Sequence, residues 1–130
     1  MFVHKTKIRL RHTDATGVLF FPEQLTLALE AFEDFLESRN SSLKQIFQAS
    51  FLLPVVHVEA NYTAPLRVGD PLEIALTVKN KGTSSITLAY RFFDPVRKIE
   101  VGTAEIVHVV VDRQKYTPLP IPEMLLQILT

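Results

Sequence analysis

A short polar loop near the N-terminus carries the carboxylate best placed for chemistry. Asp14 lies two residues after His12 and three before Gly17, and the apolar segment Val18–Phe21 follows at once. A carboxylate beside an apolar wall can act as a nucleophile or as a general base. Asp14 is therefore the candidate catalytic residue. The alternative is that it only stabilises a turn, which is a common role of aspartate in loops.

A helix is expected to begin directly after this loop. Apolar residues recur at spacings of three and four from Pro22 to Arg39, which predicts an amphipathic helix of about five turns. The stripe comprises Leu25, Leu29, Phe32 and Leu36. The first N–H groups of a helix have no partner within it, so those around Phe20 and Phe21 are available to polarise a carbonyl group.

The histidines do not form a recognisable metal site. His57 and Glu59 share one face of a predicted strand and His108 lies on another, but the chain has no HExxH motif and no cysteine. We therefore expect neither a metal nor a redox cofactor. His57 is expected to be a satisfied polar group or to line a pocket. His108 is expected at the edge of the core, and His12 as an exposed loop residue.

Length and composition restrict the class of protein. A chain of 130 residues with 47% hydrophobic and 22% charged residues predicts one globular domain spanning residues 1–130. Fourteen basic and fourteen acidic residues cancel, which argues against a nucleic-acid partner. The apolar runs are too short to cross a membrane, and the first ten residues lack a signal segment, so a cytoplasmic location is expected.

The hydrophobic periodicity predicts an α+β fold. The chain reads as a strand, the long helix and then four strands joined by turns, with short helical segments at 42–49 and 123–129. The four later strands are expected at 55–62, 72–78, 86–92 and 99–111. One helix covers only one face of a mostly antiparallel five-stranded sheet, so pairing with another subunit is expected.

Two motifs resemble those of hotdog-fold acyl-CoA thioesterases, namely the 4-hydroxybenzoyl-CoA thioesterase and YbgC-like families. Thr13–Pro22, TDATGVLFFP, resembles their T-D-A-x-G-V-V-Y-[FY]-x-x-[YF] signature, and Tyr62–Asp70, YTAPLRVGD, is similar to their Y-x-x-P-x-x-x-x-D segment. Together with the order of elements, the resemblance covers nearly the whole chain. It implies a hotdog fold, in which an antiparallel five-stranded sheet wraps around one long helix.

The resemblance also implies roles for residues of the loop. Asp14 would be the catalytic carboxylate, as nucleophile or general base, and the N–H of Phe21 would hold the thioester carbonyl. Gly17 would let the backbone approach the substrate. The chain departs from the family at Phe20 and Phe21, where many members carry tyrosine or histidine. Coenzyme A enters as part of the acyl-CoA substrate and not as a cofactor, and a homo-oligomer, dimer or tetramer, is implied.

A third stretch resembles one branch of that family. Phe51–His57, together with Ala31–Glu33, is similar to the enzymes that hydrolyse 1,4-dihydroxy-2-naphthoyl-CoA in phylloquinone and menaquinone biosynthesis. In this interpretation Phe20 and Phe21 line the acyl pocket, and His57 faces the ring hydroxyls. Two alternatives remain open. One is a thioesterase for another aryl- or short-chain acyl-CoA, and the other is a non-catalytic acyl-binding hotdog module.

Overall fold

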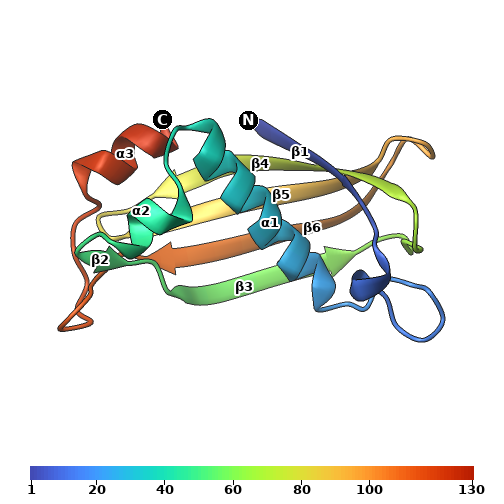
Figure 1. The fold of residues 1–130 in the computed structure, drawn as a ribbon, viewed down its shortest axis with the longest axis horizontal. Helices are drawn as coiled ribbons and strands as arrows, with labels where there is room; N and C mark the ends of the chain where they lie inside the picture. The colour runs from blue at the N-terminus through green and yellow to red at the C-terminus, as the bar shows by residue number, and fades with distance from the viewer.

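A computed structural model describes residues 1–130 and shows one long helix lying across a five-stranded antiparallel sheet (Figure 1). The sheet order is β1 (Phe2–Lys7), β4 (Pro71–Lys81), β5 (Ser85–Asp94), β6 (Ile99–Val109) and β3 (Val55–Tyr62). The helices are α1 (Glu23–Ser38), α2 (Leu43–Phe47) and α3 (Glu123–Leu129); β2 (Phe51–Leu52) and β7 (Val111–Asp112) form a separate pair. The predicted α+β class is confirmed. No helix is both long and apolar enough to span a membrane.

Helix α1 buries an apolar stripe against the sheet, as its periodicity predicts. The buried apolar residues of the helix are Leu27, Ala28, Ala31, Phe32, Phe35 and Leu36. Leu29, which the spacing places in the stripe, is instead 43% exposed. The buried face of the helix is therefore centred closer to Ala28 and Ala31 than the spacing predicts, and Leu29 lies on an exposed side of the helix.

Strand β3 is an edge strand and is exposed along most of its length. It pairs only with β6, and all of its residues except Ala60 are exposed. The register joins Val58 to Ile106 and Ala60 to the buried Ala104 on the face that packs against α1. His57 and Glu59 therefore lie on the opposite face. A long, partly apolar edge of this kind is a template for pairing with another strand.

Gln24 fastens the first turn of α1 to the sheet. Its side chain is 1% exposed, and its Nε2 donates to the carbonyl oxygens of Asn61 and Thr103, both at 3.1 Å. These two residues face each other across β3 and β6. Gly102 leaves room for the amide, because a Cβ there would lie 2.7 Å from the Asn61 carbonyl oxygen and 2.8 Å from Gln24 Oε1.

The short helix α2 begins after Ser42, which the sequence predicts as one of two possible N-cap residues. Ser42 is the N-cap; its hydroxyl accepts from the Gln45 N–H at 3.2 Å, and Gln45 Oε1 accepts from the Ser42 N–H at 3.0 Å. This reciprocal pair satisfies two backbone donors that a helix start otherwise leaves open. A short helix therefore forms within the expected segment 42–49, but it is limited to Leu43–Phe47, and it covers one end of the sheet next to β2 (Figure 1).

A Gly102→Ala substitution is expected to lower the free energy of unfolding by about 1–3 kcal/mol, because the new Cβ overpacks the Gln24 contact. Gly82→Ala is the matched control, since the nearest atom there is the hydroxyl of Ser85, which can rotate away. Urea denaturation followed by circular dichroism measures both. Equal stability of the two variants would show that the Gln24 contact does not constrain the helix.

Candidate active site

The loop from Thr13 to Leu19 is closed by its own backbone. The Asp14 N–H donates to the Val18 carbonyl at 2.9 Å, and the Gly17 N–H donates to the Asp14 carbonyl at 3.1 Å. Gly17 has a φ of +78°, a conformation that residues with a side chain rarely adopt. The glycine of the motif is therefore required by the turn that presents Asp14.

The segment between β3 and β4 is hydrogen-bonded to this loop. The Leu19 N–H donates to the Leu66 carbonyl at 2.8 Å, and the Val68 N–H donates to the Gly17 carbonyl at 2.9 Å. The two motifs identified in the sequence, Thr13–Pro22 and Tyr62–Asp70, thus lie against each other. Their contact fixes the height of the Asp14 loop above the connection between β3 and β4.

The Asp14 carboxylate is exposed, hydrogen-bonded on one oxygen and free on the other. Oδ1 accepts from the Thr16 hydroxyl at 2.6 Å, from the Thr16 N–H at 2.8 Å and from the Val18 N–H at 3.4 Å, whereas Oδ2 has no partner. The hydroxyl of Thr16, followed by its N–H, lowers the pKa of Asp14 below 3.8. Asp14 is therefore ionised at neutral pH, as a nucleophile or a general base must be.

Only one of the two expected backbone donors at the helix entry is free. The Phe20 N–H donates to the His12 carbonyl at 2.9 Å, whereas the Phe21 N–H donates to no group of the chain. The Phe21 carbonyl accepts from the Tyr62 hydroxyl at 2.8 Å and from the Gln24 N–H at 3.3 Å. Phe21 is therefore held from its carbonyl side while its N–H remains available to a ligand.

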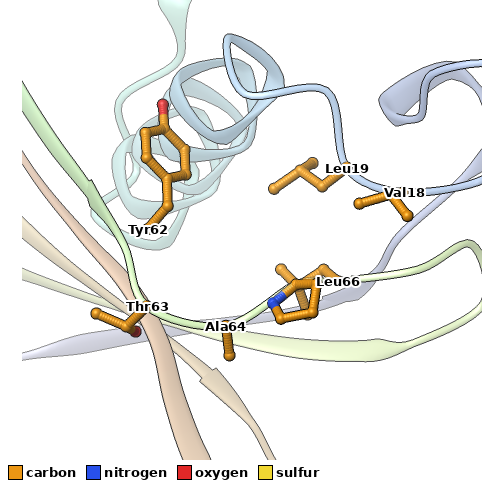
Figure 2. A pocket seen from close by; sticks show the side chains of 7 residues that line it. Val18, Leu19, Tyr62, Thr63, Ala64 and Leu66 are labelled. Carbon is orange, nitrogen blue, oxygen red and sulfur yellow. The ribbon is translucent and has the colours of Figure 1, made fainter.

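An apolar cavity lies between the two motifs (Figure 2). It has a volume of about 290 Å³ and is bounded by Val18 and Leu19 on one side and by Tyr62–Leu66 on the other. The exposed rings of Phe20 and Phe21 stand next to it, 5.4 Å apart and edge to face, and the Phe21 ring meets the Tyr62 ring at 6.4 Å. Neither Phe20 nor Phe21 is among the residues that line the cavity, so their role in an acyl pocket stays a prediction.

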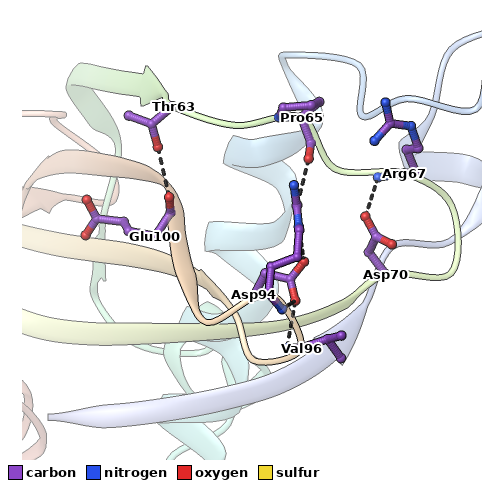
Figure 3. A network of polar contacts seen from close by, with 8 residues as sticks. Thr63, Pro65, Arg67, Asp70, Asp94, Val96 and Glu100 are labelled. Atoms are coloured by element: carbon purple, nitrogen blue, oxygen red, sulfur yellow. Dashed lines mark hydrogen bonds and ion pairs between the residues drawn. The ribbon is translucent and has the colours of Figure 1, made fainter.

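A half-buried ion pair holds Pro65, one of the residues that line this cavity (Figure 3). Arg97 Nη2 donates to the Pro65 carbonyl at 2.8 Å and Arg97 Nε to Asp94 Oδ2 at 2.7 Å. Burial alone raises the pKa of Asp94, but the hydrogen bonds from Arg97 and Val96 outweigh it, so the pKa is lowered and the pair is charged. At the other end of the segment, Asp70 Oδ2 accepts from the Arg67 N–H at 2.8 Å.

His57 is not brought to the Asp14 loop within one chain. Its side chain is 57% exposed and pairs with Glu59, Nε2 to Oε1 at 3.1 Å. Tyr62, which contacts Phe21, lies five residues further along β3 and on the opposite face, a separation of about 16 Å along the strand. Of the predicted site residues, the structure therefore groups Asp14, Gly17, Phe20 and Phe21 and leaves His57 apart.

The expectation for His12 is wrong. Its side chain is fully buried, because the 3₁₀ turn at Leu10–His12 folds the ring inward, where Nδ1 accepts from the Arg9 N–H at 2.9 Å. Burial lowers the pKa of this imidazole. His12 supports the site through its backbone, since its carbonyl accepts from the Phe20 N–H.

Sequence reasoning assigned no role to three residues that hold the site in place, namely Thr16, Gln24 and Tyr62, although Thr16 and Tyr62 belong to the two motifs. A signal for the Thr16 contact was present, because an aspartate in a turn commonly accepts from the backbone N–H two residues on. Gln24 and Tyr62 act across the fold, and their partners are backbone carbonyls that no pattern in the sequence marks. The structure contains no cluster of three or more metal-ligating side chains.

Residues 8–129 match the family model of the Thioesterase-like superfamily. The chain belongs to this superfamily. The chain is 30% identical over 127 residues to a 1,4-dihydroxy-2-naphthoyl-CoA hydrolase of Nostoc punctiforme, covering 97% of this chain and 84% of the relative. A protein of the same name from Prochlorococcus marinus is 37% identical over 113 residues, with 81% and 72% covered.

Solved structures of thioesterases share the fold. A 1,4-dihydroxy-2-naphthoyl-CoA thioesterase from Synechocystis superposes with a TM-score of 0.92 at 26% identity, covering 98% of this chain and 94% of that one. A gentisyl-coenzyme A thioesterase gives 0.84 at 21% identity, with 95% and 98% covered, which reports on the fold alone. The predicted hotdog fold and membership of the acyl-CoA thioesterases are confirmed.

Thr16→Val is expected to raise the pKa of Asp14, because it removes the hydroxyl that stabilises the carboxylate. Thr16→Ser keeps the hydroxyl and should leave the pKa low. Nuclear magnetic resonance titration of carboxyl-labelled aspartate measures both variants directly. An unchanged Asp14 pKa in Thr16→Val would contradict the assigned hydrogen bond.

Proposed function

We propose that this protein is a cytoplasmic thioesterase that hydrolyses an aromatic acyl-CoA, with 1,4-dihydroxy-2-naphthoyl-CoA as its substrate, in phylloquinone or menaquinone biosynthesis. One observation carries the proposal. The segment from Asp14 to Phe21 presents both a free carboxylate oxygen, on Asp14, and a free backbone N–H, on Phe21. The relatives that bear this activity in their names support the acyl group.

The chemistry needs a charged oxygen and a donor for the carbonyl. The Phe21 N–H donates to the thioester oxygen, where negative charge grows as the tetrahedral intermediate forms. Asp14 then has two routes. As nucleophile it forms an anhydride as the C–S bond breaks, and water cleaves the anhydride. As general base it takes a proton from water, and the resulting hydroxide attacks the carbonyl. Both routes yield the free acid and coenzyme A thiol, and neither uses a cofactor.

The same proposal includes a second copy of the chain. The exposed edge of β3 carries the exposed apolar side chains Val55, Val56, Val58 and Tyr62, next to the exposed Leu29 of α1. A two-fold axis through the middle of β3 pairs the edge with itself, so that Tyr62 lies beside the partner's Val55. The site is then formed between subunits in a homodimer, or in a tetramer of two such dimers.

Asp14→Asn and Asp14→Ala are expected to lower kcat for 1,4-dihydroxy-2-naphthoyl-CoA by roughly 10² or more, the scale of losing a general base or nucleophile. Both should fold normally, because an exposed loop residue changes stability by less than about 1 kcal/mol. Glu37→Gln, an exposed carboxylate on α1, is the control. Release of thiol measures turnover. Substantial activity in Asp14→Ala would refute the catalytic assignment.

Val58→Lys is expected to dissociate the oligomer, because it places two like charges near the two-fold axis. Val96→Lys adds the same charge at an exposed turn and should leave the oligomer intact. Light scattering gives the mass of each variant, and the specific activity of Val58→Lys should rise with protein concentration. A wild-type protein that is monomeric and fully active at micromolar concentration would contradict the shared site.

A further inference from the structure

A second cavity, here called the ring pocket, lies against the middle of α1, at Leu29–Glu33. It has a volume of about 290 Å³ and is enclosed by α1, α2, β2 and the start of β3. Its walls are almost wholly apolar and include Phe32, Ile46, Phe51 and Leu53, and the residues at its open side, Leu29, Phe47 and Val55, are exposed. The packing of the fold leaves this space unfilled.

Two polar residues line this cavity, the exposed Glu33 and the buried His108, and His108 has an unused acceptor. His108 is 5% exposed, and its Nδ1 lies 3.0 Å from the Leu53 carbonyl oxygen. A carbonyl oxygen only accepts, so Nδ1 carries the hydrogen and Nε2 carries a lone pair. Nε2 is buried without a hydrogen-bond partner. Burial also lowers the pKa of His108, which keeps the ring neutral at physiological pH.

Stacked aromatic side chains line the pocket, and its volume is that of a small aromatic group. The imidazole of His108 stacks on Phe32 with centroids 5.5 Å apart and planes 26° from parallel, and Phe32 stacks in turn on Phe35. Taking about 30 Å³ for a water-sized heavy atom, the volume holds roughly ten such atoms, the size of a bicyclic aromatic skeleton. A buried acceptor without a donor costs free energy that a ligand hydroxyl can recover.

We propose that the ring pocket binds the aromatic part of the acyl group and that His108 Nε2 accepts a hydrogen bond from a ring hydroxyl. This assignment rests on the proposed thioesterase function and names the residue that selects its substrate. It differs from the sequence expectation for His57, whose imidazole lies on the outer face of β3 and is paired with Glu59.

The pocket of one copy serves the Asp14 loop of the other. Within one chain Val55, at the open side of the pocket, and Tyr62, beside Phe21, are separated by the length of β3, about 23 Å. Antiparallel pairing of two β3 edges brings Tyr62 next to the partner's Val55. The thioester carbonyl can then lie at Phe21 while the ring enters the partner's pocket.

Substrate discrimination tests the assignment of His108. His108→Phe keeps the ring stack and removes the acceptor, and His108→Gln keeps an acceptor. For His108→Phe we expect kcat/KM for 1,4-dihydroxy-2-naphthoyl-CoA to fall by roughly tenfold or more, whereas that for 2-naphthoyl-CoA changes by less than about threefold. His108→Gln should restore part of the discrimination. Equal losses on both thioesters, or loss of discrimination in His57→Ala alone, would overturn the proposal.

A binding measurement separates this proposal from the proposed activity. In the Asp14→Asn protein with ¹⁵N-labelled histidine, 1,4-dihydroxy-2-naphthoyl-CoA should shift the His108 Nε2 resonance, and 2-naphthoyl-CoA should leave it nearly unchanged. This readout requires neither turnover nor a folded His108 variant. Absence of hydrolysis by the wild-type protein would refute the function but not the pocket, whereas an unmoved Nε2 resonance on saturation with the dihydroxy thioester would refute the pocket.

Discussion

The site depends on where the first turn of α1 is held above the sheet. Gln24 ties that turn to the carbonyls of Asn61 and Thr103, and Tyr62 ties the preceding peptide through the Phe21 carbonyl. The groups that hold this turn therefore come from the end of β3 and from the neighbouring strand β6. A backbone N–H stabilises an oxyanion only when its position is fixed before the charge develops. The Phe21 N–H meets this requirement because the peptides on both sides of Phe21 are held. The carbonyl of Phe20, which shares a peptide plane with this N–H, accepts from the Glu23 N–H at 2.8 Å, and the Phe21 carbonyl accepts from Tyr62.

The carboxylate is prepared in a different way. Asp14 is exposed, so its reactivity does not come from desolvation; it comes from a turn in which Thr16 and Val18 occupy one oxygen and leave the other free. Those bonds favour the charged form and restrict the direction of the free oxygen. Binding of an apolar acyl group beside the carboxylate would remove water and make the free oxygen a stronger nucleophile or base.

Local patterns in the sequence predicted most of the fold. The periodicity of α1, the alternation of the strands and the two motifs placed the elements close to their observed bounds, and Asp14, Gly17 and Phe21 lie together because they share one loop. Periodicity did not predict that Leu29 is exposed or that His12 is buried. The exposure of Leu29 depends on the rotation of α1 about its axis on the sheet, and the burial of His12 depends on the conformation of the short 3₁₀ turn. The face of β3 that carries His57 was predicted, but its distance from Asp14 depends on the length of the strand.

The two histidines on β3 and β6 show how burial, more than residue type, decides which imidazole can recognise a ligand. An exposed imidazole such as His57 is already solvated and paired, so a new hydrogen bond to it mainly replaces one with water or Glu59. The acceptor of His108 has no such alternative, because it is buried without a hydrogen-bond partner. A hydroxyl bound there replaces nothing. Selectivity and bond cleavage would then reside at opposite ends of β3, and only pairing of two edges would join them into one site.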